Sequence, residues 1–144
     1  MSEQIYPHPI VGALIFNQQG KIFLMRSPKW GGKFCLIGGH IELGETIEQA
    51  IRREVKEETN LNVFDIQFLG VQEFIFGEEF HKKRHFIFLD HFCKTKDTDI
   101  ILDGTEGIEY VWVTTDESLA LPLNPYTKNT ILEYKKKYLR ENSF

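Results

Sequence analysis

Apolar and polar positions change along the chain in blocks of different period, and these blocks predict an alternation of strands and helices. Runs that are apolar and rich in β-branched or aromatic residues, bounded by turn residues, are typical of strands. They predict strands at 10–17, 22–26, 34–40, 61–76, 85–93 and 108–113. The stretches between them that are polar, or that hold glycine and proline, are predicted to be connections, at 27–33, 77–84 and 94–107.

Helical spacing predicts helices over 45–60 and 124–142, and a short helix in TTDESLA (114–120). Thr46 lies near the start of the first helix and Asn60 at its end. In the last helix, Asn124 is expected as the N-cap and Pro125 as the first residue. Strands around one helix, with another helix at the end, predict the α/β class, with a mixed sheet between helices. No repeat or linker divides the sequence, so one domain over 1–144 is expected.

Composition and charge narrow the class of protein. The 144 residues are 42% hydrophobic and include twelve phenylalanines, which suffices for a core without disulfides. The net charge of −4 gives the chain no overall attraction for nucleic acid or anionic membranes. Cys35 and Cys93 show no metal-binding spacing and are expected to be reduced and structural. With no signal-peptide pattern and no apolar stretch of about 20 residues, a soluble cytoplasmic protein is expected.

The segment RREVKEETN, residues 52–60, concentrates negative charge on one helix. Spacings of three and four residues place Glu54, Glu57 and Glu58 near one another. An ideal wheel puts them beside the apolar stripe, whereas Arg52 and Arg53 point away. In a partly dried cleft, with a dielectric of about 20 and a spacing of about 5.5 Å, each pair would repel by roughly 3 kcal/mol. Divalent cations held by carboxylate oxygens would offset this repulsion; a solvated acidic helix is the alternative.

A longer window carries a family resemblance. Residues 39–61 follow the pattern G-x5-E-x7-R-E-U-x-E-E-x-G-U, where U is apolar, and depart from it only at Asn60, which stands in place of the last glycine. This pattern resembles the Nudix box. Asn is the best substitute where a left-handed conformation is needed after a helix. The chain is most similar to the MutT-like nucleoside triphosphate pyrophosphohydrolases within that family.

The resemblance implies a Nudix-type α/β/α sandwich around a mixed β-sheet. It also implies hydrolysis, dependent on Mg²⁺ or Mn²⁺, of a nucleoside diphosphate linked to another group. The implied metal ligands are the backbone carbonyl of Gly39 and the carboxylates of Glu54, Glu57 and Glu58. By the same resemblance Arg53 fixes a catalytic glutamate, and Glu45 either assists metal binding or orients Arg53.

Several site residues keep alternative interpretations. The general base could be Glu57, Glu45 or Glu109, and the alternative for Glu109 is a surface acid on an edge strand. Arg26 could contact phosphate or could end a surface strand. Trp30 and Phe34 could stack on a base, although an aromatic residue in a small domain is more often core.

Asn124 could read a base edge, because its amide presents both a donor and an acceptor; the alternative is the N-cap role alone. The basic run HKKRH (81–85) is interpreted as a solvated hairpin tip. The leading function is hydrolysis of a (d)NTP to (d)NMP and pyrophosphate. Alternatives are an ADP-ribose or other sugar-nucleotide pyrophosphatase and a non-catalytic nucleotide-sensing domain. The expected partner is a small nucleotide, not nucleic acid or membrane, and a homodimer stays open.

Overall fold

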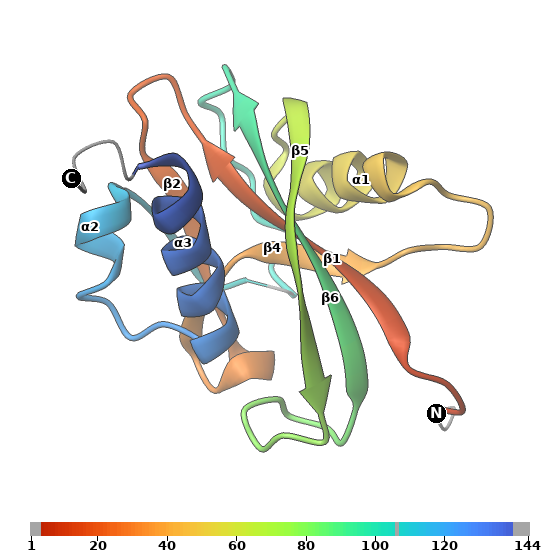
Figure 1. Cartoon of the computed structure of the whole chain (residues 1–144). Coiled ribbons are helices and arrows are strands. Elements are labelled where there is room, and N and C mark those ends of the chain that lie inside the picture. Colours follow the sequence, from red (N-terminus) through yellow and green to blue (C-terminus); the bar gives the residue numbers. More distant parts are fainter. Residues whose placement is uncertain (1–3, 106, 140–144) are drawn as a thin grey trace.

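The central strand of the fold is β1, and the remaining elements are placed by their relation to it (Figure 1). The computed structural model describes residues 4–105 and 107–139. The strands in chain order are β1 (His8–Phe16), β2 (Ile22–Ser27), β3 (Lys33–Cys35), β4 (Ile37–His40), β5 (Val63–Ile75), β6 (His85–Thr95) and β7 (Glu109–Val113). The helices are the 3-10 helix η1 (Pro28–Trp30), α1 (Ile47–Thr59), α2 (Thr115–Ser118) and α3 (Pro125–Tyr138).

The sheet is mixed. β1 runs parallel to β6 along its whole length, and β5 pairs antiparallel with β6 at the edge. On its other side β1 pairs first with β4 and then, at its end, with β2, both antiparallel. The parallel partners β1 and β6 need a long connection, and this connection contains α1, which packs against β4.

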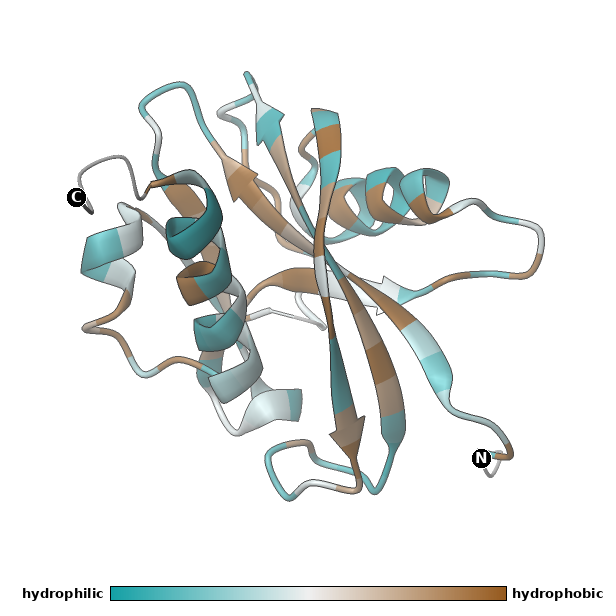
Figure 2. Ribbon diagram, in the orientation of Figure 1, coloured by the Kyte–Doolittle hydropathy of each residue, from teal (hydrophilic) through white to brown (hydrophobic). Residues whose placement is uncertain are grey.

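Helices cover both faces of the sheet, so that β1 is buried on both sides. Val11, Ala13 and Ile15 pack in one core cluster with the apolar face of α1, whereas Leu14 packs in a second cluster with Ile131 of α3. Successive side chains of a strand point to opposite faces, which explains why the whole run is apolar. Figure 2 shows this hydrophobic colour along the central strands. The predicted α/β/α sandwich is confirmed.

Some predicted elements differ from those observed. The predicted strand 34–40 is two strands, β3 on β2 and β4 on β1. The break falls at Leu36, whose backbone N–H donates to Thr127 Oγ1 of α3 at 3.1 Å instead of to a neighbouring strand. Ile47, which an ideal helical wheel places on the apolar stripe of α1, is exposed. The predicted last helix reaches Tyr138, and residues 140–142 lie outside the described part of the chain.

The two cysteines are buried and form no disulfide, as expected. Burial raises the pKa of each thiol to about 12. Cys93 belongs to the core cluster on the α1 side. No helix in the described part of the chain combines the length and the apolar character that crossing a bilayer requires.

Both ends of α1 are capped, by the two residues that the sequence placed near its start and at its end. Thr46 accepts from the backbone N–H of Gln49, whose side chain in turn accepts from the Thr46 N–H, which completes a capping box. Asn60 adopts the left-handed conformation, with φ of 72°, and its N–H donates to Lys56 O. Its side-chain amide also donates to the carbonyl of Asp99 at 3.1 Å. The departure from glycine at this position is thus compatible with the turn that follows the helix.

We expect Asn60→Ala to be less stable than Asn60→Gly by about 1 kcal/mol, because only the alanine strains the left-handed conformation. Both variants lose the hydrogen bond to Asp99, so that the comparison isolates the backbone. The measurement is the free energy of unfolding in urea. Equal stability of the two variants would contradict the assignment of strain to this position.

Candidate functional site

The acidic face of α1 runs from solvent into the protein. Glu58 is 4% exposed, the Glu54 side chain is 16% exposed, and the Glu57 side chain is 59% exposed. The three carboxylates therefore differ in environment although they share one helix. The exposed Glu57 is the most freely solvated of the three, and a buried carboxylate such as Glu58 is costly unless positive charge or hydrogen bonds compensate.

Gly39 of β4 lies directly against the Glu54 carboxyl. A Cβ atom at Gly39 would stand 2.2 Å from Glu54 Cδ, so that no larger residue fits without moving the carboxyl. The position is fixed on the other side by pairing of Gly39 with Val11 of β1. The glycine therefore allows the strand backbone and the helix carboxylate to approach each other closely.

Arg53 connects the carboxylates around it. Its guanidinium donates from Nε and Nη2 to the two oxygens of Glu45, at 2.6 and 3.0 Å. Nη1 donates to Glu54 Oε2 at 3.0 Å and to Glu57 Oε1 at 3.2 Å, and Nη2 also donates to the carbonyl of His40 at 2.9 Å. One side chain thus joins β4, the loop before α1 and the helix itself. A planar guanidinium suits such two-oxygen contacts.

The helical wheel was wrong about this arginine. It predicted that Arg53 would point away from the acids, whereas the structure brings its guanidinium to Glu54 and Glu57. The physical reason is that a wheel records the direction of Cα–Cβ, not the reach of a long flexible side chain. Arg52 does point away, and it pairs with Glu48 at 3.1 Å.

The arginine also changes the protonation of its main partner. Hydrogen bonds from the Arg53 side chain and then from the Glu42 backbone N–H lower the pKa of Glu45 to about 2. In return, the hydrogen bond to Glu45 raises the pKa of Arg53 further above its ordinary value. Glu45 is therefore held as a carboxylate, which makes it a weak proton acceptor near neutral pH.

The donor set suits a hard divalent cation in kind. Carboxylate oxygens are the ligands that Mg²⁺ and Mn²⁺ prefer. The α1 helix carries three glutamates in this region, and the carboxylate of Glu54 lies against the backbone of Gly39. Within residues 4–105 and 107–139, no three His, Cys, Asp or Glu side chains already converge as a metal-binding group. In this arrangement Arg53 engages Glu54 and Glu57. The ligand assignment stays a prediction.

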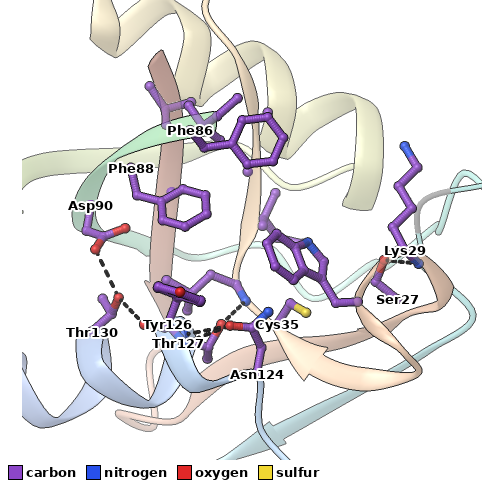
Figure 3. Close-up of a pocket in the computed structure, with 18 of the residues that line it drawn as sticks. Ser27, Lys29, Cys35, Phe86, Phe88, Asp90, Asn124, Tyr126, Thr127 and Thr130 are labelled. Carbon is purple, nitrogen blue, oxygen red and sulfur yellow. Dashed lines mark hydrogen bonds between the residues drawn. The ribbon is translucent and has the colours of Figure 1, made fainter. Parts of the chain in front are cut away.

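A cavity of about 170 Å³ opens beside the acidic helix (Figure 3). Glu58, Gly39 and His40 form part of its wall, so that the cavity and the Nudix box share residues. Rings from separate segments form another part of the wall: Trp30, Phe80, Phe86, Phe88 and Tyr126. Polar side chains complete the lining, among them Asp90, Asn124 and Thr130.

The rings pack on one another by edge and tilted contacts. The Trp30 and Phe80 centroids are 4.7 Å apart, those of Phe80 and Phe86 5.2 Å, and those of Phe88 and Tyr126 5.5 Å. Such packing holds each ring in place, so that flat apolar walls are formed before a ligand arrives. Flat, electron-rich walls are suited to the faces of a nucleobase.

Only some of the predicted substrate-binding residues lie at this cavity. Trp30 and Asn124 line it. Asn124 also takes the N-cap role, because its Oδ1 accepts from the backbone N–H groups of Tyr126 and Thr127. Phe34 is instead buried in the core cluster on the α3 side. Trp30 and Asn124 are thus brought together with Glu58, whereas Phe34 is not.

Arg26 and Glu109 contact each other and are not among the residues that line the cavity. Arg26 Nη1 is 3.0 Å from Glu109 Oε1, and Arg26 Nε donates to the carbonyl of Gly32. Both side chains are about half exposed and belong to the paired strands β2 and β7. Their predicted roles toward phosphate and as a general base stay predictions.

Sequence analysis missed most of the cavity. Phe86, Phe88 and Asp90 line it from β6. Phe80 lines it from the loop between β5 and β6, and Tyr126 lines it from the start of α3. Residues 86, 88 and 90 alternate along a predicted strand and therefore share a face. The sequence showed this alternation. It did not show which face of the strand lines the cavity, because that depends on how β6 packs against α3.

Comparisons with known proteins agree with the fold and the box. The NUDIX domain family matches residues 6–134, so the chain belongs to this family. The NAD-capped RNA hydrolase NudC of Vibrio vulnificus is 39% identical over 74 residues, 51% of this chain and 27% of that protein. NudC of Mycobacterium tuberculosis strain H37Rv is 30% identical over 110 residues, 76% of this chain and 33% of that protein. The chain thus spans about a third or less of these relatives.

Solved structures share the fold. The MutT NUDIX hydrolase of Burkholderia pseudomallei has a TM-score of 0.76 at 21% identity, covering 89% of this chain and 98% of that one. A NUDIX hydrolase of Nitrosomonas europaea has a TM-score of 0.73 at 26% identity, covering 91% and 90%. The NUDIX domain of Shewanella oneidensis NrtR, solved with ADP-ribose, has a TM-score of 0.75 at 17% identity, covering 92% and 88%.

Gly39→Ala should lower the free energy of unfolding by about 1 kcal/mol, because the added Cβ displaces the Glu54 carboxyl, which then loses its hydrogen bond from Arg53 Nη1. Gly70→Ala is the matched control, since a Cβ there meets nothing within 4 Å. Urea denaturation measures both. A Gly39→Ala protein as stable as the Gly70→Ala control would show that the close approach is not required.

The stability that Glu45 contributes should depend on pH. Its pKa of about 2 in the folded protein lies below the ordinary 4.5, so its contribution is complete above pH 4.5 and is lost as the pH falls toward 2. Wild type should therefore exceed Glu45→Gln in stability at neutral pH, and the difference should disappear over that interval. Unfolding in EDTA across the pH series measures it. The exposed Glu48→Gln is the control, and a difference as large near pH 2 as at pH 7 would refute the pairing.

Proposed function

We propose that this protein is a divalent-cation-dependent pyrophosphohydrolase that converts a (d)NTP to (d)NMP and pyrophosphate. The observation that carries the proposal is the shared wall: Glu58 of the Nudix box and the base-sized aromatic cavity face the same space. A nucleoside held by the rings would place its phosphates toward the acidic end of α1. Binding and chemistry would then occur at one site.

In this proposal Glu54, Glu57 and Glu58, with the carbonyl of Gly39, hold Mg²⁺ or Mn²⁺. The cation, when bound, would neutralise phosphate charge and lower the pKa of a water molecule. Arg53 holds Glu54 and Glu57 in position through the contacts described above. Arginine thus acts as a positioning residue for the carboxylates.

Among the three candidate bases, the geometry favours Glu57. Glu45 is bound through both oxygens by Arg53 and has a low pKa. Glu109 is paired with Arg26 on the surface. Glu57 is exposed, and its one recorded ion pair is a single contact through Oε1. Its carboxylate is therefore the group best able to take a proton from the attacking water.

The cavity supports a substrate with one base enclosed. Its volume of about 170 Å³ and its ring lining suit a single nucleobase. Asn124 uses its Oδ1 for the cap of α3, so the side-chain NH₂ is the group that remains for a base edge. The base-reading and capping roles of this residue are therefore compatible.

A second candidate is hydrolysis of the pyrophosphate in a dinucleotide of the NAD type. It is favoured by the similarity to the NAD-capped RNA hydrolases. The net charge of −4 gives little support for a long RNA partner, so the free dinucleotide is the form to test. A nucleotide sensor without activity is disfavoured, because every acidic residue of the box is retained. A homodimer and a cytoplasmic location stay predictions.

Glu58→Gln should lower the rate of hydrolysis on the order of 100-fold or more, because a neutral amide replaces an anionic ligand. The matched control is Glu48→Gln, an exposed glutamate on the same helix. The assay covers the common (d)NTPs, NAD, ADP-ribose, sugar nucleotides and dinucleoside polyphosphates, with Mg²⁺ and with EDTA.

A (d)NTP should yield monophosphate and pyrophosphate, and EDTA should abolish the reaction. Stepwise release of orthophosphate, or full activity of the Glu58→Gln protein, would contradict the proposal. Preferred cleavage of NAD over every (d)NTP would establish the second candidate instead.

A further inference from the structure

A buried carboxyl group lies in the wall of the aromatic cavity, away from the Nudix box in sequence. Asp90 follows Phe86 and Phe88 on the same face of β6 and is 6% exposed. Figure 3 shows it on the cavity side, next to Thr130 of α3. The catalytic scheme above makes no use of this side chain, and a buried carboxyl is costly unless it has a partner.

One oxygen of Asp90 is anchored by the protein. Oδ2 accepts from Gln72 Nε2 at 2.9 Å and from Thr130 Oγ1 at 3.1 Å. Gln72 is itself held, because its Nε2 also donates to the carbonyl of Tyr126 and its Oε1 accepts from Asn129. Donors on β5 and α3 thus fix the orientation of the carboxyl group.

The other oxygen, Oδ1, is directed to the space beside Gly12. A Cβ on Gly12 would come within 2.9 Å of Oδ1, and Gly12 is itself part of the cavity wall. Among the described residues, the hydrogen bonds recorded for Asp90 all go to Oδ2. Oδ1 is therefore the acceptor that the protein leaves for a ligand.

We propose that Asp90 selects the base of the bound nucleotide by accepting an N–H from its exocyclic amino group at Oδ1. This inference rests on the proposed function only in requiring a nucleobase in the cavity. The selected class is adenine or cytosine over their deaminated counterparts, hypoxanthine and uracil. In those counterparts a carbonyl oxygen replaces the amino group and would face the carboxyl oxygen with no hydrogen between them.

The electrostatics of the pocket agree with an N–H donor as the missing partner. Burial raises the pKa of Asp90, and the hydrogen bonds from Gln72 and Thr130 only oppose that effect. A ligand amino group would supply a further donor and would offset the cost of burial. A site built to hydrogen-bond a ligand group discriminates strongly against an analogue that lacks it.

The alternative is that Asp90 only ties β6 to α3 through Gln72 and Thr130. Asp90→Asn separates the two roles, because the shapes are nearly identical. The amide oxygen can keep Gln72 and Thr130 as donors, while the NH₂ group takes the place of Oδ1. The group facing the ligand then changes from acceptor to donor, so the preference should shift toward the carbonyl-bearing base.

The experiment measures binding of AMP, IMP, CMP and UMP in EDTA by calorimetry, with no hydrolysis involved. Wild type should prefer AMP over IMP, or CMP over UMP, on the order of tenfold or more. Asp90→Asn should lower that ratio by a similar factor or reverse it. Asp97→Asn is the matched control, because Asp97 also accepts two hydrogen bonds, from Asn62, but lies outside this cavity; its ratios should equal those of wild type.

Should Asp90→Asn fail to fold, the ¹³Cγ resonance of Asp90 in the wild-type protein replaces it. The resonance should move with AMP or CMP and move less with the matched IMP or UMP. Equal affinities within both pairs, unchanged ratios in Asp90→Asn, or no selective shift of the resonance would overturn the inference. Hydrolysis without base selectivity would support the proposed function and overturn the inference about Asp90. Selective binding without hydrolysis would leave only the inference.

Discussion

The guanidinium of Arg53 is the interaction on which the arrangement of the acidic helix depends. It binds both oxygens of Glu45, one oxygen each of Glu54 and Glu57, and the carbonyl of His40. These partners come from β4, from the loop that follows it and from α1. A lysine could not replace it, because an ammonium group is a single point charge without the planar fork. The contact therefore orients the carboxylates and also closes the loop.

More than one positive charge offsets the repulsion among the glutamates. Glu45, Glu54 and Glu57 share the charge of Arg53, whereas Glu58 lies in the cavity wall. Under the proposed function a divalent cation adds the remaining compensation. Gly39 allows the backbone of β4 and the Glu54 carboxylate to lie close together. The contacts of Arg53 and the proposed cation thus both offset the repulsion among the glutamates of this helix.

Under the proposed function, the aromatic cavity binds the base of the nucleotide next to the acidic residues of α1. Its rings come from η1, the loop after β5, β6 and the start of α3, and they pack on one another before a ligand is present. Asn124 has a structural role and also lines the cavity. Its Oδ1 caps the first turn of α3, and its side-chain amide forms part of the cavity wall. At Gly12, the absence of a side chain leaves room for the Asp90 carboxyl.

The sequence by itself determined the features that depend on spacing within one segment. Residues 39–61 were sufficient to predict a helix over 45–60 with Thr46 near its start, the left-handed Asn60 and the family. Only the tertiary structure decided which distant segments meet: that Arg53 turns toward the acids, that Arg26 pairs with Glu109, and that Phe86, Phe88 and Asp90 face Tyr126. The physical reason is that a local pattern records the direction in which a side chain leaves the backbone. Contacts between segments also depend on strand order, register and the reach of each side chain.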